Sequence, residues 1–196
     1  MKKYIYIILG ILVINCGYFS SKLIQFNDLP VPDGPYLVGS KLFYWIDASR
    51  KEWYIDKYTD KRKLMVQVWY PTIYEKNNIK MHYIERMDER IQYIAKELEV
   101  PEFLLKNIAH IQSNSLFDAE SIDGIFPIIL FSHGLGGMRT QNTIQAEALA
   151  SRGYVVVSTD HMYDANISLY PDNFFARNIS QTRDLTDEEW YIIRNN

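Results

Sequence analysis

The stretch from Ser132 to Gly137, Ser-His-Gly-Leu-Gly-Gly, has the residue types of a ligand-binding turn. It directly follows the apolar run 128–131, which predicts a short strand buried on both faces. Glycines adopt backbone angles that are closed to other residues and let the main chain approach a ligand closely. Open α/β sheets bind ligands at such strand ends. The stretch therefore predicts a ligand site; the alternative is a strand-to-helix turn that uses glycine for steric reasons only.

A strand–helix–strand unit is expected to hold this turn. Thr140 is the expected cap of a helix over 141–152, and Gly153 fits the C′ position that ends it. A second buried strand over 154–158 follows. Two such strands joined by a helix predict a right-handed parallel unit. The expected inner face of the helix carries Ile144, Ala148 and Leu149.

The sequence before this unit predicts antiparallel strands and then helices. Extended runs over 36–47 and 63–70 indicate an antiparallel start to the sheet. Pro101 suits the first turn of a helix that continues to residue 111. An amphipathic helix is expected over 84–98, where apolar residues recur at helical spacing: Ile84, Met87, Ile91, Ile94 and Leu98. The predicted fold class is α/β, with an antiparallel lead-in to a largely parallel sheet.

The composition excludes several functions. The chain has 196 residues and a net charge of −3, from 21 basic and 24 acidic residues, which gives no reason to expect nucleic-acid binding. Cys16 is the only cysteine, so no internal disulfide can form. The four histidines are scattered and no cluster has zinc spacing.

The first 20 residues predict a signal peptide or an uncleaved membrane anchor, because Lys2 and Lys3 precede the apolar run 4–14. Cys16 also has the position of a lipoprotein-type acceptor, although Asn15 stands where such signals usually have a small residue. The alternative for Cys16 is a buried thiol within the anchor. Each interpretation predicts export or membrane attachment. Residues 21–35, whose later part is rich in Pro, Asp and Gly, predict a linker to the folded domain.

Two blocks, 126–140 and 149–161, resemble the platelet-activating factor acetylhydrolase family, the plasma-type lipases of the α/β-hydrolase fold and their bacterial relatives. The resemblance runs from about residue 34 to the end and identifies residues 36–196 as a partial α/β-hydrolase domain. Four further pieces resemble the first strands of the family: Gly34-Pro-Tyr36, Trp45-Ile-Asp47, Ser49-Arg50 and Val66-Gln-Val-Trp-Tyr-Pro71.

The resemblance implies a serine-dependent carboxylic ester hydrolase that needs no metal or cofactor and acts on phospholipids or other esters with short or oxidised acyl chains. It assigns the backbone amide of Leu135 to the oxyanion hole, where one donor typically contributes ~3 kcal/mol to transition-state stabilisation. Gly134, Gly136 and Gly137 would shape the loop around that amide. His133 would fix the loop by hydrogen bonds rather than act as the proton-transfer base.

The catalytic triad of the family is absent from the sequence. It contains no Gly-x-Ser-x-Gly motif and no histidine after His161, whereas the fold uses the order Ser, Asp, His. Asp160 and His161 would lie near the site, where they shape the pocket or have a solvated or capping role. Asp164 and Asp172 have no supporting context as triad acids. The sequence thus predicts an esterase truncated before its nucleophile, with the edge of strand 154–158 exposed.

Two alternatives remain at this stage. The chain could be a non-catalytic, membrane-tethered remnant or interaction module, which the missing motif favours. It could also belong to a dienelactone-hydrolase-like enzyme, which shares the fold and would place a Cys nucleophile in the missing half.

Overall fold

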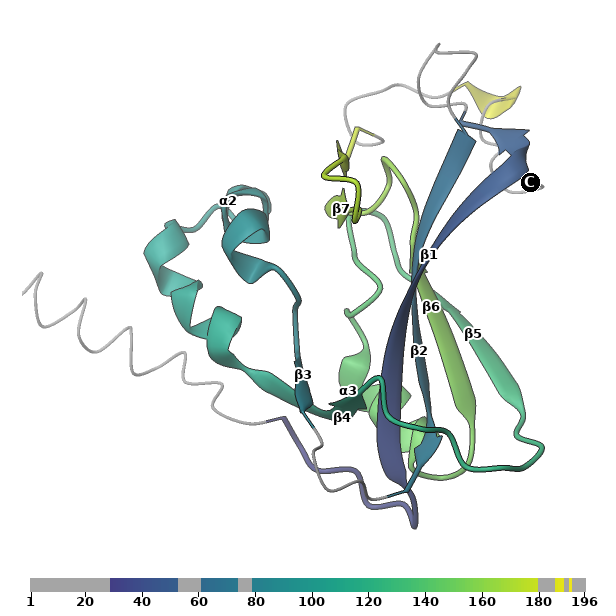
Figure 1. Ribbon diagram of the computed structural model, residues 1–196. Coiled ribbons are helices and arrows are strands. Elements are labelled where there is room, and N and C mark those ends of the chain that lie inside the picture. Colours follow the sequence, from purple (N-terminus) through teal and green to yellow (C-terminus); the bar gives the residue numbers. More distant parts are fainter. Residues whose placement is uncertain (1–28, 53–60, 74–78, 180–185, 189–190, 192–196) are drawn as a thin grey trace, which may run out of the picture.

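The computed structural model describes residues 29–52, 61–73, 79–179, 186–188 and 191. Its largest element is a long, twisted hairpin of β1 (Leu37–Lys51) and β2 (Lys61–Thr72) (Figure 1). The two strands pair antiparallel from Leu37↔Thr72 to Asp47↔Arg62. This confirms the antiparallel start that the alternation of residues predicted.

Six strands form one mixed sheet in the order β3-β4-β1-β2-β6-β5. Between β2 and the end of the sheet lie β6 (Val155–Asp160) and β5 (Ile128–Ser132). On the other side of β1 lie β4 (Gln112–Phe117) and β3 (Lys80–His82). β5 and β6 pair in parallel, as do β1 and β4, and the other pairs are antiparallel. A separate two-stranded sheet joins β7 (Ile167–Leu169) to β8 (Phe175–Arg177).

The helix between β5 and β6 is α3 (Thr143–Ala150), which is shorter than the predicted 141–152. Asn142 stands at its N-cap, so the predicted capping by Thr140 is wrong; the Thr140 carbonyl instead accepts a bond from the Thr143 hydroxyl. The C-terminal prediction is confirmed. Gly153 has φ 90°, and its amide and that of Tyr154 bond back to the last turn of the helix as in a Schellman motif.

The inner face of α3 agrees with the prediction at Leu149, which packs against the core, and differs from it elsewhere. Ala146 and Ala150 pack against Val38, Trp69 and Val156 of the sheet, whereas Ile144 is exposed. The helix is turned toward β4, because the buried carboxylate of Glu147 accepts hydrogen bonds from side chains of that strand. A buried carboxylate is costly unless it is hydrogen-bonded, so these bonds settle which face of α3 is covered.

A helical subdomain lies between β3 and β4, to one side of the main hairpin (Figure 1). Its helix α2 (Met87–Glu97) covers the middle of the predicted 84–98 and buries Met87, Ile94 and Ala95. The helix predicted from Pro101 to residue 111 is instead two 3-10 turns, η1 (Glu102–Leu104) and η2 (Lys106–His110). Leu105 and Ile108 pack in the core of the subdomain and Ile111 is also buried, so buried residues recur every three positions, the period of a 3-10 helix.

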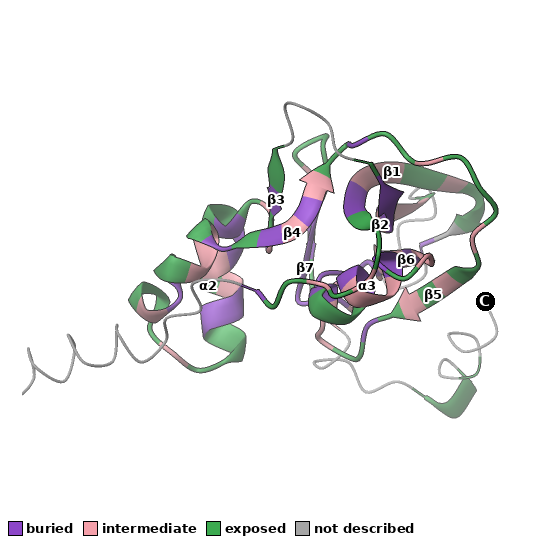
Figure 2. Cartoon of the chain, turned by 90° about the horizontal axis from the view of Figure 1, so that it is seen from below, coloured by how far each residue is buried: buried purple, intermediate pink, exposed green. Residues whose placement is uncertain are grey.

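The strand β5 is not buried on both faces as predicted. Exposed and half-buried residues alternate along β5 (Figure 2). Ile128 is 66% exposed and Leu130 79% exposed, while Ile129 and Phe131 pack on the side of α3. With their neighbours on β1, β2 and β6 the exposed residues form what we call the open face. It is the sheet surface that faces away from α3, and by strand alternation and register it carries Phe43, Val68, Ile128, Leu130 and Val155.

The edge of the sheet also differs from the prediction. β6 lies between β2 and β5, so the expected exposed edge at 154–158 is wrong. Within the part of the chain described, β5 has β6 as its only partner and is an edge strand, as is β3 at the other end of the sheet.

Residues 29–35, the described part of the predicted linker, lie against the end of α3. The Gly34 amide donates to Ser151 Oγ over 3.2 Å, and Asp33 forms an ion pair with Arg152. The predicted signal peptide or anchor at 1–20 lies outside the described residues. No helix within the described ranges has the length and hydropathy needed to cross a membrane.

Candidate active site

The predicted loop is a tight turn at the carboxyl end of β5. The Gly137 amide donates to the Gly134 carbonyl over 2.8 Å, and Gly136 has φ 72° whereas Leu135 does not have a positive φ. This combination defines a type II turn, whose third position favours glycine because φ is positive there. The sequence forms the turn here because glycine occupies that position.

The three glycines of the turn have different reasons to be glycine. A side chain at Gly137 would clash, since its Cβ would lie 2.1 Å from Gln141 Oε1 and 2.9 Å from the Gly134 carbonyl. Gly136 is required by its φ angle. Gly134 has no heavy atom within 4 Å of a Cβ position, so it faces open space. A ligand can therefore approach the turn at Gly134.

The Leu135 amide, predicted as the oxyanion donor, is available to a ligand. Among the residues that the structure describes, it donates to no acceptor. The two amides that follow it are occupied: Gly136 N–H donates to the Asp164 carbonyl over 3.0 Å, and Gly137 N–H closes the turn. Among the described residues, the turn thus presents the Leu135 N–H without an acceptor on a constrained backbone, which is what stabilisation of a developing oxyanion requires.

His133 holds the turn, in agreement with its predicted structural role. It is buried, and its Nε2 accepts the backbone N–H of His161 over 3.0 Å. The other ring nitrogen, Nδ1, donates to the Gly134 carbonyl over 2.8 Å. Since both ring nitrogens are engaged in the turn, His133 is not positioned as a proton-transfer base.

A buried cluster of charges anchors the segment just after the turn. The Arg139 amide donates to Asp160 Oδ1 over 2.7 Å, and its guanidinium forms ion pairs with Asp160 and with Glu85. Arg90 of α2 lies 3.6 Å from the Glu85 carboxylate and 4.0 Å from that of Asp160. The cluster connects the turn, the end of β6 and the helical subdomain. Asp160 is fully buried, so the solvated alternative for this residue is wrong.

The two arginines of this cluster differ in their electrostatics. Burial and the nearby Arg139 lower the pKa of Arg90. Burial also acts to lower the pKa of Arg139, but attraction by Asp160 and Glu85 outweighs it and the pKa is raised. Arg139 contacts both carboxylates directly, whereas Arg90 is farther from them, which explains the opposite directions.

Ser132 and His161 come together beside the turn, a pair that the sequence analysis missed. Ser132 Oγ lies 2.6 Å from His161 Nε2. The parallel pairing of the two predicted strands could have indicated this pair. Ser132 lies opposite Thr159, and His161 follows Thr159 by two residues. Burial and the neighbouring His133 lower the pKa of His161, against smaller opposing effects of Asp164 and Asp160.

Among the described residues, neither Asp164 nor Asp172 forms a triad with these groups. Asp172 lies on the surface, 2.7 Å from Lys63 Nζ, and the hydrogen bond from Lys63 lowers its pKa. The Asp164 carbonyl accepts the amide of the turn, and its carboxylate acts on His161 by charge only.

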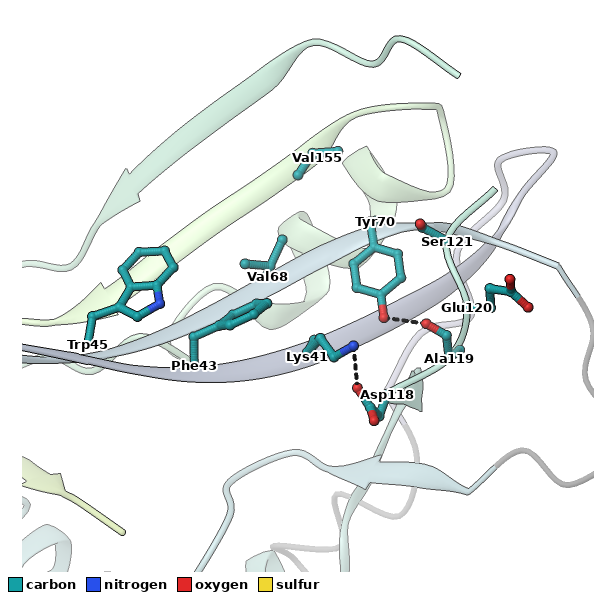
Figure 3. Close-up of a pocket in the computed structure, with 10 residues that line it drawn as sticks. All are labelled: Lys41, Phe43, Trp45, Val68, Tyr70, Asp118, Ala119, Glu120, Ser121 and Val155. Atoms are coloured by element: carbon teal, nitrogen blue, oxygen red, sulfur yellow. Dashed lines mark hydrogen bonds and ion pairs between the residues drawn. The ribbon is translucent and has the colours of Figure 1, made fainter. Parts of the chain in front are cut away.

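A hollow of about 680 Å³ lies on the open face and shares no residue with the turn (Figure 3). Phe43, Val68 and Val155 line its apolar part. At its rim the Tyr70 hydroxyl donates to the Ala119 carbonyl over 2.6 Å, and Lys41 pairs with Asp118 at 2.7 Å. The hollow marks uncovered apolar sheet surface rather than a site built around the turn.

With the fold and the turn in place, the comparison with protein families is decisive. The family model described as platelet-activating factor acetylhydrolase, isoform II, matches residues 22–195. The chain belongs to this acetylhydrolase family. The resemblance seen in residues 126–140 and 149–161 is thereby confirmed, and the hydrolase and esterase lineage with it.

A solved structure supports the fold of this acetylhydrolase family member. The chain is similar to a ferulic acid esterase from Streptomyces cinnamoneus, with a TM-score of 0.70 and 24% sequence identity. The match covers 86% of this chain and 45% of the esterase. The chain therefore has an α/β-hydrolase-like fold and spans about half the length of that enzyme. The assignment of Leu135, Gly134 and Gly136 to an oxyanion loop stays a prediction.

Proposed function

We propose that these 196 residues are the oxyanion-loop half of a serine-dependent carboxylic ester hydrolase. The observation that carries the proposal is the free Leu135 amide on a type II turn at the carboxyl end of β5. Membership of the acetylhydrolase family supports the ester hydrolase lineage. The charge cluster around Arg139 and the hydrogen bonds of His133 keep the turn in place, as preorganised catalysis requires.

In this function the turn stabilises negative charge and does not transfer a proton. When a serine attacks the ester carbonyl, negative charge develops on the carbonyl oxygen, and the Leu135 N–H donates a hydrogen bond to it. The nucleophile, its histidine base and the orienting aspartate are proposed to lie in sequence beyond these residues, in the order Ser, Asp, His. The proposed substrates are phospholipids or other esters with short or oxidised acyl chains. The segment 1–20 is proposed to direct export or to attach the enzyme to a membrane.

The open face supports the view that more sequence belongs to the functional unit. Ile128 and Leu130 expose apolar side chains beside the edge of β5 that has no partner strand in the described ranges, and a further strand and covering helices would bury them. The same surface also favours the second candidate, a non-catalytic interaction module that uses the open face. The two candidates differ in whether a nucleophile follows.

The coding sequence that follows Asn196 provides the test. We expect a Gly-x-Ser-x-Gly motif, in frame or after a frameshift, and we expect the extended protein to hydrolyse p-nitrophenyl acetate. A fluorophosphonate should label the serine of that motif. Acetyl and long-chain phosphatidylcholines then test the acyl preference, with faster release of acetate expected. Absence of the motif in every frame would overturn the hydrolase function for this chain in favour of the interaction module.

A further inference from the structure

Ser132 is the exposed serine at the end of β5 and has a histidine at hydrogen-bond distance. Its Oγ lies 2.6 Å from His161 Nε2, within the range that nucleophile–base pairs use. Both residues are held by the backbone: Ser132 is paired with Thr159 in the sheet, and the His161 amide donates to His133. Neither side chain takes part in closing the turn.

We propose that Ser132 and His161 form a nucleophile–base pair that takes acyl groups from small activated esters. This activity goes beyond the proposed function, because it needs no elbow serine and resides in the 196 residues alone. The free amide of Leu135 lies three residues after Ser132, and Gly134 between them faces open space. The hollow on the open face does not include Ser132, and the acyl group we propose is therefore a small one.

The chemical step is an acyl transfer in two stages. Ser132 Oγ attacks the ester carbonyl carbon while its proton moves to His161 Nε2, and the Leu135 amide donates to the resulting oxyanion. The intermediate collapses as the C–O bond to the leaving group breaks, and the leaving alcohol takes the proton from His161. Water, activated by His161, then hydrolyses the Ser132 ester and releases the acid.

A base must be unprotonated at neutral pH, and the lowered pKa of His161 favours that form. Burial and the nearby His133 favour the neutral ring, and Arg62 acts in the same direction. Asp164 and Asp160 oppose this and would stabilise the cation formed during attack. In the Nδ1–H tautomer, His161 Nε2 accepts the Ser132 hydroxyl proton, which is the arrangement the step requires.

The test is fluorophosphonate labelling of the purified 196-residue chain in detergent, with the adduct mapped by peptide mass spectrometry. We expect the adduct on Ser132. The variant Ser132→Ala should lose it, and His161→Gln should slow labelling by at least ~100-fold, the typical contribution of a positioned base. Ser121→Ala is the matched control, since Ser121 is also exposed, and should label at the wild-type rate. Labelling should decline at acid pH as His161 becomes protonated.

A second pair of variants covers the case in which Ser132→Ala or His161→Gln unfolds, which circular dichroism would show. Ser132→Cys should react with iodoacetamide at least ~10-fold faster than Ser121→Cys, because His161 favours the thiolate. No adduct on Ser132, or equal rates for wild type and folded His161→Gln, would overturn the proposal. Equal reactivity of the two cysteine variants would also overturn it. These results leave the proposed function standing, because that function depends on the serine beyond residue 196.

Discussion

Replacement of Asp160 by asparagine should strongly destabilise the protein. The buried cluster contains two guanidinium groups, of Arg90 and Arg139, and two carboxylates, of Glu85 and Asp160. Asparagine keeps the size of Asp160 and can still accept the Arg139 amide, so the variant removes mainly the charge. Two buried cations then share one carboxylate, and that of Glu85 is partly exposed.

The expected loss in unfolding free energy is about 3–5 kcal/mol, the usual cost of leaving a buried charge without its partner. Domains are stable by only about 5–15 kcal/mol, so this is a large fraction of the total. The melting temperature should fall by roughly 6–20 °C, at about 2–4 °C per kcal/mol for a chain of this size. Urea unfolding followed by tryptophan fluorescence measures the change, because Trp69 is buried in the core beside α3.

The matched control is Asp118→Asn, which makes the same chemical change in the exposed pair with Lys41 (Figure 3). Asp118 has φ 52°, a conformation that asparagine tolerates well, so no strain is added. The unfolding free energy of Asp118→Asn should fall by at most about 1 kcal/mol. The double variant R139M/D160N should lose less unfolding free energy than the two single variants together, because each single variant leaves the other charge buried without its partner. A loss below about 1 kcal/mol for Asp160→Asn would refute the assignment of a tightly coupled buried cluster.

The turn and His161 give two further predictions. Gly136→Ala should lower the unfolding free energy by about 1–2 kcal/mol because of its positive φ, whereas Gly134→Ala should change it little; equal urea midpoints for the two variants would contradict the type II turn. Because the folded state lowers the pKa of His161 below its usual 6.5, the unfolded chain binds more protons and stability should fall as the pH drops below about 6.5. The decline should be smaller in His161→Gln, and an unchanged pH dependence of the urea midpoint in that variant would contradict the shift.

Local sequence signals predicted the elements around the turn well. The alternation of β1 and β2, the glycine at the end of α3 and the glycine-rich turn after β5 each depend on neighbours in the chain. Such features follow from backbone geometry, which a few residues determine.

Long-range features could not be predicted in the same way. The run 128–131 is apolar throughout, yet whether both faces are covered depends on segments distant in sequence, and Ile128 and Leu130 are exposed. The inner face of α3 is set by bonds from Asn114 and Ser115 to Glu147, which lies more than 30 residues away. The partners of Arg139 are likewise remote. From sequence alone, a charged residue is expected to be exposed. It can be buried only when the fold brings an opposite charge beside it.

The central claim is that the Leu135 amide donates to an oxyanion, and one comparison tests it most directly. Proline suits the second position of a type II turn but has no N–H, so Leu135→Pro removes the donor while the turn is kept. Leu135→Ala keeps the N–H and controls for loss of the side chain. For ester hydrolysis by the protein extended to its elbow serine, we expect Leu135→Pro to lower kcat/KM by ~10²–10³-fold and Leu135→Ala to have little effect. Equal kcat/KM values for the two variants would contradict the claim.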